Sequence, residues 1–281
     1  DVYKRQHAQG WPYYAEHLIL ATPDNGVAAA MYAACKATVK VGDGNEISLH
    51  EQTNYPFEET IRFTVNTPKV VSFPFYLRIP SWTEGATIFV NGKKVAANPE
   101  AGQYACINRE WKDNDQVEIQ LPMQLSMRTW QVNKNSVSVD YGPLTMSLKI
   151  DEDYVKKDSR ATAIGDSKWQ EGADASQWPT YEIYAKTPWN YALVLGKNEP
   201  LKDFKVVHKE WPADNFPFTV ASTPIEVKAI GRKVPSWVID QYDLCSELPE
   251  MDAPKGEKEE ITLIPMGAAR LRVSAFPNTR E

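Results

Sequence analysis

The chain has 281 residues, of which 42% are hydrophobic and 11% aromatic, so it can fill one large core or two of ordinary size. This composition excludes disorder for most of the length. The formal net charge is −6 and no basic stripe with interleaved aromatic residues is present, which argues against a nucleic-acid-binding role. No run approaches the roughly 18 apolar residues that cross a bilayer, so no membrane partner is expected.

The first part of the chain favours a short helix. Pro12 stands where a first helical turn tolerates proline, and Trp11, Tyr14 and Leu18 follow the i, i+3, i+7 spacing of one helix face. Residues 27–41 are ambiguous, because their alanines favour helix and their closing Ala-Thr-Val-Lys-Val favours strand. A single short helix cannot bury an aromatic face by itself. We therefore interpret residues 7–45 as the remnant of a helical domain with connecting strands.

From residue 46 onward, the sequence has the period-2 alternation of half-buried strands. Ile61, Phe63 and Val65 alternate with polar residues. Asn91-Gly92 stands between two apolar runs, which is the strongest short signal for a β-hairpin. Further strands are expected in the segments VSFPFYLRIPSW, DQVEIQLPM and SVSVDYGPLTMSLKI. Strands at this spacing, joined by turn residues, predict an antiparallel sandwich over residues 46–150.

Charged residues interrupt this pattern at residues 151–163, which favours an exposed loop or a domain boundary. A second patterned block, richer in Trp and Pro, predicts a smaller β domain inserted at residues 151–257. At the end of the chain, Leu271, Val273 and Ala275 alternate with polar residues. A lone strand is unstable, so we expect residues 258–281 to pair back with the first sandwich.

The cysteines and histidines do not form a metal-binding pattern. Cys35, Cys106 and Cys245 are odd in number and far apart, so neither a disulfide framework nor a zinc knuckle is expected, and each is interpreted as a small buried hydrophobe. The histidines at positions 17, 50 and 208 have no partner at metal-ligand spacing. Adjacent carboxylates such as Glu58 and Glu59 point to opposite faces of a strand, so they do not converge on one glycosidic bond.

A series of segments, taken in chain order, resembles glycoside hydrolase family 127, the bacterial β-L-arabinofuranosidase-like enzymes. The segments are QGWP, TPDNGVAAAMY, YPFEETIRFTV, FYLRIPSW, VNGKKV, INREWKDNDQVEIQLPM, DYGPLTMSL and ITLIPMGAARLRVSAFP, preceded by His7. Together they extend over essentially everything after residue 6. The resemblance implies a catalytic α/α toroid of paired helices followed by β-sandwich domains. The fold class expected for this chain is therefore mainly β, with antiparallel sandwiches preceded by a short helical remnant of the toroid.

The resemblance also implies the chemistry of the intact parent protein. Family members perform retaining hydrolysis with a cysteine nucleophile held on zinc by further cysteines and a glutamate, while a second glutamate is the general acid/base. Zinc keeps the sulfur deprotonated at neutral pH, and the second carboxyl protonates the leaving oxygen. The parent is expected to remove terminal L-arabinofuranose or a similar sugar from plant glycans.

The sequence departs from the family where the nucleophile belongs. In relatives a Cys-Cys pair precedes the Gln-Gly-Trp-Pro stretch, but here residues 1–6 hold no cysteine and are interpreted as a non-native leader. The chain is thus expected to be a C-terminal fragment without catalytic or metal-binding residues, its sugar substrate reached only through the missing domain. His7 and Trp11 are candidate substrate-binding residues. The compartment is expected to be periplasmic or cytoplasmic, and no oligomeric state is assigned.

An alternative interpretation belongs to another functional class. The nine tryptophans include candidate sugar-stacking platforms, because aromatic rings suit the apolar faces of sugars. In this interpretation the β region is a carbohydrate-binding module without catalysis. The candidates lie in the second block: Trp169, Trp178, Trp189 and Trp211.

Overall fold

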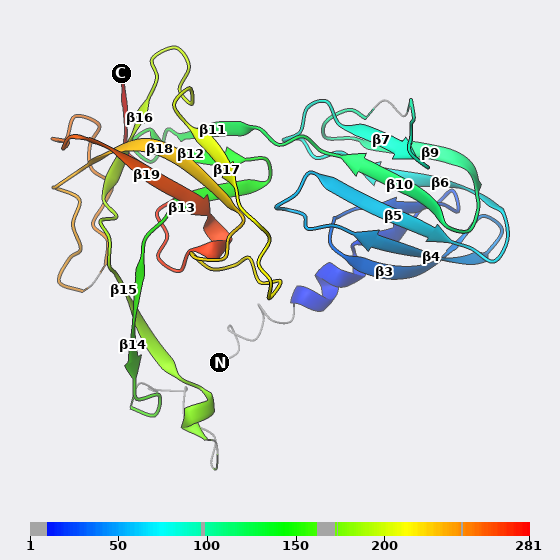
Figure 1. Cartoon of the computed structure of the whole chain (residues 1–281), viewed down its shortest axis with the longest axis horizontal. Coiled ribbons are helices and arrows are strands. Elements are labelled where there is room, and N and C mark those ends of the chain that lie inside the picture. The colour runs from blue at the N-terminus through cyan, green and yellow to red at the C-terminus, as the bar shows by residue number, and fades with distance from the viewer. Residues whose placement is uncertain (1–9, 97–98, 162–171, 173, 243) are drawn as a thin grey trace. The chain divides into compact units, whose positions relative to one another are not determined.

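The computed structural model describes residues 10–96, 99–161, 172, 174–242 and 244–281, and it is composed mainly of β-strands (Figure 1). The prediction of a mainly β fold is confirmed. The chain divides into two compact units, which comprise residues Asp1–Gln124 and Leu125–Glu281. No described helix is long and apolar enough to cross a membrane.

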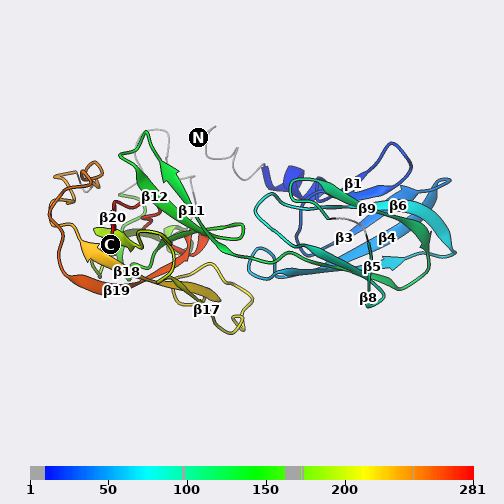
Figure 2. The same ribbon diagram turned by 90° about the horizontal axis from the view of Figure 1, so that it is seen from above.

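Unit 1 contains two sheets that face each other (Figure 2). In the four-stranded sheet, β2 and β6 run parallel and the other neighbours are antiparallel. Its order is β1 (Ile19–Ala21), β2 (Val27–Ala29), β6 (Val71–Arg78) and β9 (Tyr104–Trp111). The six-stranded sheet is fully antiparallel. Its order is β3 (Cys35–Val41), β4 (Asn45–Gln52), β5 (Thr60–Asn66), β10 (Asp115–Gln120), β7 (Thr87–Val90) and β8 (Lys93–Lys94).

The alternation in the sequence correctly identifies the core of unit 1. Ile61, Phe63 and Val65 of β5 are at most 1% exposed, and β6 buries every second residue in the same way. Trp111 is fully buried, stacks on Phe73 and donates its ring N–H to the Phe73 carbonyl at 2.9 Å. Burying each such side chain stabilises the fold by about 1.5–3 kcal/mol. The Asn91-Gly92 hairpin is also confirmed, with the positive φ angles of 49° and 75° that its turn type requires.

A short helix over residues 10–16 precedes β1, as the sequence predicts. Leu18, just after it, is buried in the core of unit 1. The ambiguous segment 27–41 contains two strands, β2 and β3. Tertiary pairing overrides the helix preference of its alanines, since β2 lies between β1 and β6.

Gly26 lies where the turn between β1 and β2 meets β6. A Cβ atom at this position would be 2.3 Å from the Pro74 carbonyl oxygen and 2.6 Å from its Cγ. We expect Gly26→Ala to lower the free energy of unfolding of unit 1 by about 1–2 kcal/mol, because the backbone must move to relieve the overlap. Gly10→Ala is the control, since nothing lies within 4 Å of a Cβ there. Urea denaturation measures both, and equal unfolding midpoints would contradict this account.

Unit 2 is built on one large sheet, in which β17 pairs with β18 at one side. The order is β11 (Leu125–Trp130), β12 (Ser136–Tyr141), β13 (Leu144–Leu148), β19 (Lys258–Pro265), β18 (Ile225–Lys233), β16 (Tyr191–Leu195) and β20 (Asn278–Arg280), with β17 (Lys205–His208) beside it. A separate two-stranded ribbon, β14 (Glu152–Lys157) and β15 (Thr180–Ala185), extends away from that sheet (Figure 1).

The unit boundaries differ from those expected from the sequence. The sequence predicts that residues 125–150 and 258–281 belong to the first sandwich and that residues 151–257 are an insertion. In the structure β19 pairs with β13 on one side and with β18 on the other, so all three belong to unit 2. The chain leaves unit 1 after β10, at Gln124, instead of near residue 150. Unit 2 is therefore one continuous stretch of chain and not an insertion.

Two local predictions are also wrong. The expected loop at residues 151–163 contains β14, whose ribbon exposes side chains on both faces and thus has no apolar alternation. The expected strand at residues 271–275 is an irregular segment beside β12 and β13. It is held by bonds such as that from the Leu148 amide to the Val273 carbonyl at 2.8 Å and by an isolated bridge between Val137 and Phe276.

Candidate functional site

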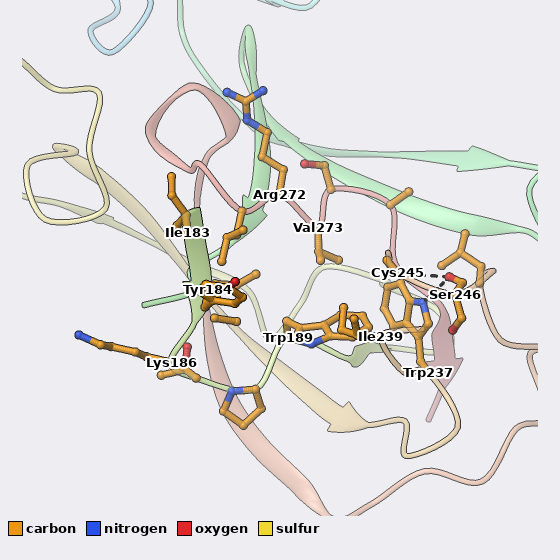
Figure 3. Close-up of a pocket in the computed structure, with 18 residues that line it drawn as sticks. Ile183, Tyr184, Lys186, Trp189, Trp237, Ile239, Cys245, Ser246, Arg272 and Val273 are labelled. Carbon is orange, nitrogen blue, oxygen red and sulfur yellow. Dashed lines mark hydrogen bonds between the residues drawn. The ribbon is translucent and has the colours of Figure 1, made fainter. Parts of the chain in front are cut away.

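A groove of about 1020 Å³ lies in unit 2 (Figure 3). Three segments form it: the end of β15 with residues 186–189, the loop at 237–248, and the irregular segment 271–275. Trp189 and Trp237 meet edge to face, with ring centroids 5.0 Å apart. Trp237 is only 4% exposed and donates its ring N–H to the Ser246 carbonyl at 3.1 Å. This ring therefore belongs to the core, and Trp189 supplies the wall of the groove.

The polar groups of the groove are few. Lys186 pairs with Asp153 at 3.3 Å, and Arg272 donates to the Ala269 carbonyl at 2.9 Å. Both side chains carry their charged ends away from the two tryptophans (Figure 3). The Ser274 hydroxyl is buried and has no hydrogen-bond partner within the described part of the chain. The lining contains no carboxylate, so it offers no general acid for a glycosidic oxygen.

Cys245 is the one cysteine that lines this groove. Burial raises the pKa of its thiol, and its Sγ contacts the Ser246 carbonyl at 3.4 Å. A thiol attacks only as the thiolate, which this environment disfavours. The groove can therefore enclose an apolar ligand, but its lining has no activated nucleophile.

Unit 1 contains a buried carboxyl that the sequence analysis did not single out. Glu51 is 1% exposed, accepts the Ala33 N–H at 3.0 Å, and has its other oxygen 3.6 Å from the Cys35 sulfur. Burial raises the pKa of Glu51 to about 8. Burial and then the neighbouring Glu51 raise the pKa of Cys35 to about 11. Both groups are thus protonated at neutral pH.

The sequence does hold a signal for this carboxyl. Ile47 and Leu49 are the inward-facing residues of β4, and Glu51 continues their period-2 series. A charged residue at an inward position is unusual, because burial penalises the charged form. The N-terminal helix reaches the same region, since burial and then Glu51 raise the pKa of Tyr14.

The two candidate substrate-binding residues are not brought together in the described structure. His7 lies outside the described residues. Trp11 is 70% exposed on the helix over residues 10–16 and contacts Tyr14 edge to face at 6.0 Å. The role of both residues in sugar binding stays a prediction.

The expectation of three buried cysteines is wrong for two of them. Cys106 and Cys245 are exposed, and Cys35 is half-buried. Cys106 lies on β9 between the buried residues Ala105 and Ile107. Because side chains alternate along a strand, its side chain faces outward although cysteine is usually buried. Among the described residues, no group of three or more His, Cys, Asp or Glu side chains could hold a metal ion. Cys35 and Glu51 are only two donors, so the residues described here do not fit a structural or catalytic zinc.

Comparison with known proteins agrees with the C-terminal boundary of unit 1. The family model described as "Beta-L-arabinofuranosidase, GH127 middle domain" matches residues 26–123. The matched range takes in β2 through β10 of unit 1 and ends one residue before that unit does. Residues 26–123 of unit 1 are thus similar to the middle domain of glycoside hydrolase family 127. A search of curated proteins found no match.

Solved structures extend this GH127 likeness of fold over both units. A GH127 β-L-arabinofuranosidase from Geobacillus stearothermophilus T6 has 21% sequence identity and a TM-score of 0.59, over 94% of this chain and 35% of its own. A second structure, described as a glycoside hydrolase, has 22% identity and a TM-score of 0.58, over 92% and 36%. A GH127 β-arabinofuranosidase has 20% identity and a TM-score of 0.57, over 92% and 36%. This chain thus spans about a third of the length of these structures, and at such identities the likeness concerns the fold.

Proposed function

We propose that this chain is the accessory β region of a retaining glycoside hydrolase that acts on terminal L-arabinofuranose or similar sugars of plant glycans. The match of residues 26–123 to the GH127 middle domain carries this proposal. The shared fold of both units with a β-L-arabinofuranosidase supports it. In this role the two units brace a catalytic domain, and the chemistry belongs to residues outside the segment described here.

The chemistry of the described residues is consistent with an accessory role. A retaining glycosidase needs an acid and a nucleophile that face one bond across a distance of about 5 Å. Glu51 has the raised pKa of a general acid, but at 1% exposure it reaches no substrate oxygen. The groove of unit 2 has the space for a sugar but no carboxylate in its lining. No catalytic step is therefore assigned to this chain.

We expect the purified chain to leave p-nitrophenyl β-L-arabinofuranoside intact and to hold no stoichiometric zinc. The assay is release of nitrophenol, with metal content measured by mass spectrometry after dialysis against zinc. A GH127 β-L-arabinofuranosidase that spans the full family length is the positive control for both readouts. Circular dichroism establishes that the chain is folded. Turnover or one bound zinc per folded chain would contradict the proposal.

The alternative, a carbohydrate-binding module with tryptophan platforms, gains no support from the placement of its candidates. Trp169 lies outside the described residues. Trp178 is 67% exposed near the ribbon of β14 and β15, while Trp211 bonds to Asn215 through its ring N–H at 2.7 Å. Trp189 lines the groove beside Trp237. These rings do not form one continuous stacking surface.

A further inference from the structure

The outer face of the four-stranded sheet in unit 1 has a hollow of about 500 Å³ that no role described above uses. Residues of β6 and β9 alternate between the core and this face. Tyr76 of β6 and Tyr104 of β9 both point outward. Tyr76 is directly opposite Cys106, and Tyr104 is opposite Arg78, so the two tyrosines are diagonal neighbours on one face. The hollow lies within the size range of small-molecule sites.

The walls and floor of the hollow come from the strands β2, β6 and β9 and from the turn between β1 and β2. Ala28 of β2 pairs with Tyr76 and is small enough to leave space above it. Pro23, in the turn between β1 and β2, adds an apolar wall. Tyr104 is 48% exposed, so much of its side chain is accessible to a ligand.

A fixed carboxylate stands at the side of these rings. Asp24 accepts a hydrogen bond from the Tyr76 hydroxyl at 2.6 Å and a second one from the Thr22 hydroxyl. The bonds from the Thr22 and Tyr76 hydroxyls, followed by the backbone N–H groups of Asp24 and Gly26, lower the pKa of Asp24, so the group is ionised at neutral pH. Asp24 is exposed on this face, so its carboxylate is accessible to a ligand.

We propose that this hollow binds a single sugar ring. The apolar face of the sugar packs on Tyr104 and Tyr76, and its hydroxyls donate to Asp24. The combination of aromatic surface, ionised acceptor and small volume suits a neutral polyol, whereas Asp24 repels anionic ligands. The groove of unit 2 has no carboxylate in its lining to accept these hydrogen bonds. The identity of the sugar, L-arabinofuranose, rests on the proposed function, but the site itself rests on the geometry of Asp24, Tyr76 and Tyr104.

The test is a titration of the ¹⁵N-labelled chain with methyl β-L-arabinofuranoside, followed by amide chemical shifts. We expect saturable shifts at Asp24, Tyr76 and Tyr104, with a Kd on the order of 1 mM for a single exposed ring. Tyr104→Ala should weaken binding by roughly tenfold, because it removes the stacking surface. Asp24→Asn, which keeps the shape and removes the charge, should weaken it by a similar factor, about tenfold.

Tyr154→Ala is the matched control. Tyr154 is 49% exposed and also donates to a carboxylate, Glu152, at 2.6 Å, but it belongs to the ribbon of unit 2 and does not line the hollow. This variant should bind as the parent chain does. Absence of shifts in unit 1 at saturating sugar, or equal loss of binding in all three variants, would overturn the proposal. Shifts confined to the groove residues Ser246 and Val273 would also overturn it.

The titration is independent of the hydrolysis assay. Turnover of the nitrophenyl glycoside would contradict the accessory role and leave the shifts at Asp24 and Tyr104 unchanged. Conversely, an inactive chain with no shifts would overturn the sugar site alone.

Discussion

Glu51→Gln should raise the free energy of unfolding of unit 1 by about 3 kcal/mol at pH 7, since each unit between two pKa values is worth about 1.4 kcal/mol. The folded pKa of Glu51 is about 8, whereas the ordinary value is 4.5. Because the folded pKa is raised, the free energy of unfolding of unit 1 carries no penalty from Glu51 below pH 4.5. This penalty grows progressively as the pH rises toward 8. Glutamine stays neutral and can still accept the Ala33 N–H, so the variant avoids this loss.

Hydrogen exchange of the β5 amides, followed by mass spectrometry from pH 4 to pH 9, measures this difference within unit 1. The parent and the variant should converge near pH 4 and separate up to pH 8. Glu46→Gln is the control, because Glu46 is exposed on the same strand, β4. The buried-acid explanation would be refuted if Glu51→Gln had the same pH profile of exchange as the parent chain. It would also be refuted if Glu46→Gln changed that profile as Glu51→Gln does.

Glu226→Gln should have the opposite effect in unit 2 and lower its free energy of unfolding by about 2–3 kcal/mol at pH 7. The Glu226 side chain is 8% exposed and has three lysines around it: Lys149 at 2.9 Å, Lys209 at 3.1 Å and Lys228 at 3.5 Å. Burial acts to raise the pKa of Glu226, but the bonds from Lys149 and Lys209 outweigh it and lower the pKa to about 2.

A depressed pKa reverses the dependence on pH. The contribution of Glu226 is fully present above pH 4.5 and disappears as the pH falls toward 2. Hydrogen exchange at β18 and β19 should therefore separate parent and variant at pH 7 and bring them together in acid. Glu182→Gln is the control, since the pair of Glu182 with Lys157 is exposed and should contribute little. A loss of stability that persists unchanged at pH 2 would exclude the ion cluster as its cause.

Strands with one buried face could be predicted from the sequence. In β5 and β6 the side chains that face the core are apolar, and those that face solvent are more polar. Apolar residues therefore recur at every second position of the sequence. The ribbon of β14 and β15 was missed because neither face is covered, and its backbone pairing leaves no mark on hydrophobicity. The irregular segment around Val273 is predicted as a strand because its apolar and polar residues alternate in the sequence. It is hydrogen-bonded to β13 through the Val273 backbone but does not form a strand.

The candidate sites were less predictable than the strands. Glu51 could have been found as the charged third member of the series begun by Ile47 and Leu49. The hollow depends on the alignment of β6 with β9, which brings Tyr76 and Tyr104 together although β7 and β8 lie between them in the chain. The unit boundary depends on the pairing of β19 with β13 and β18. Such pairings at long range are set by three-dimensional packing, which no local pattern encodes.

Each unit has one exposed cysteine, and these two thiols can be labelled. Cys106 lies in unit 1 and Cys245 in unit 2, and both are accessible, whereas Cys35 is half-buried with its pKa raised to about 11. Because thiolates react and thiols do not, Cys35 should be modified slowest. A pair of spin labels can thus be attached without engineering the chain. Pulsed electron resonance between them would give the distribution of distances separating the units in solution.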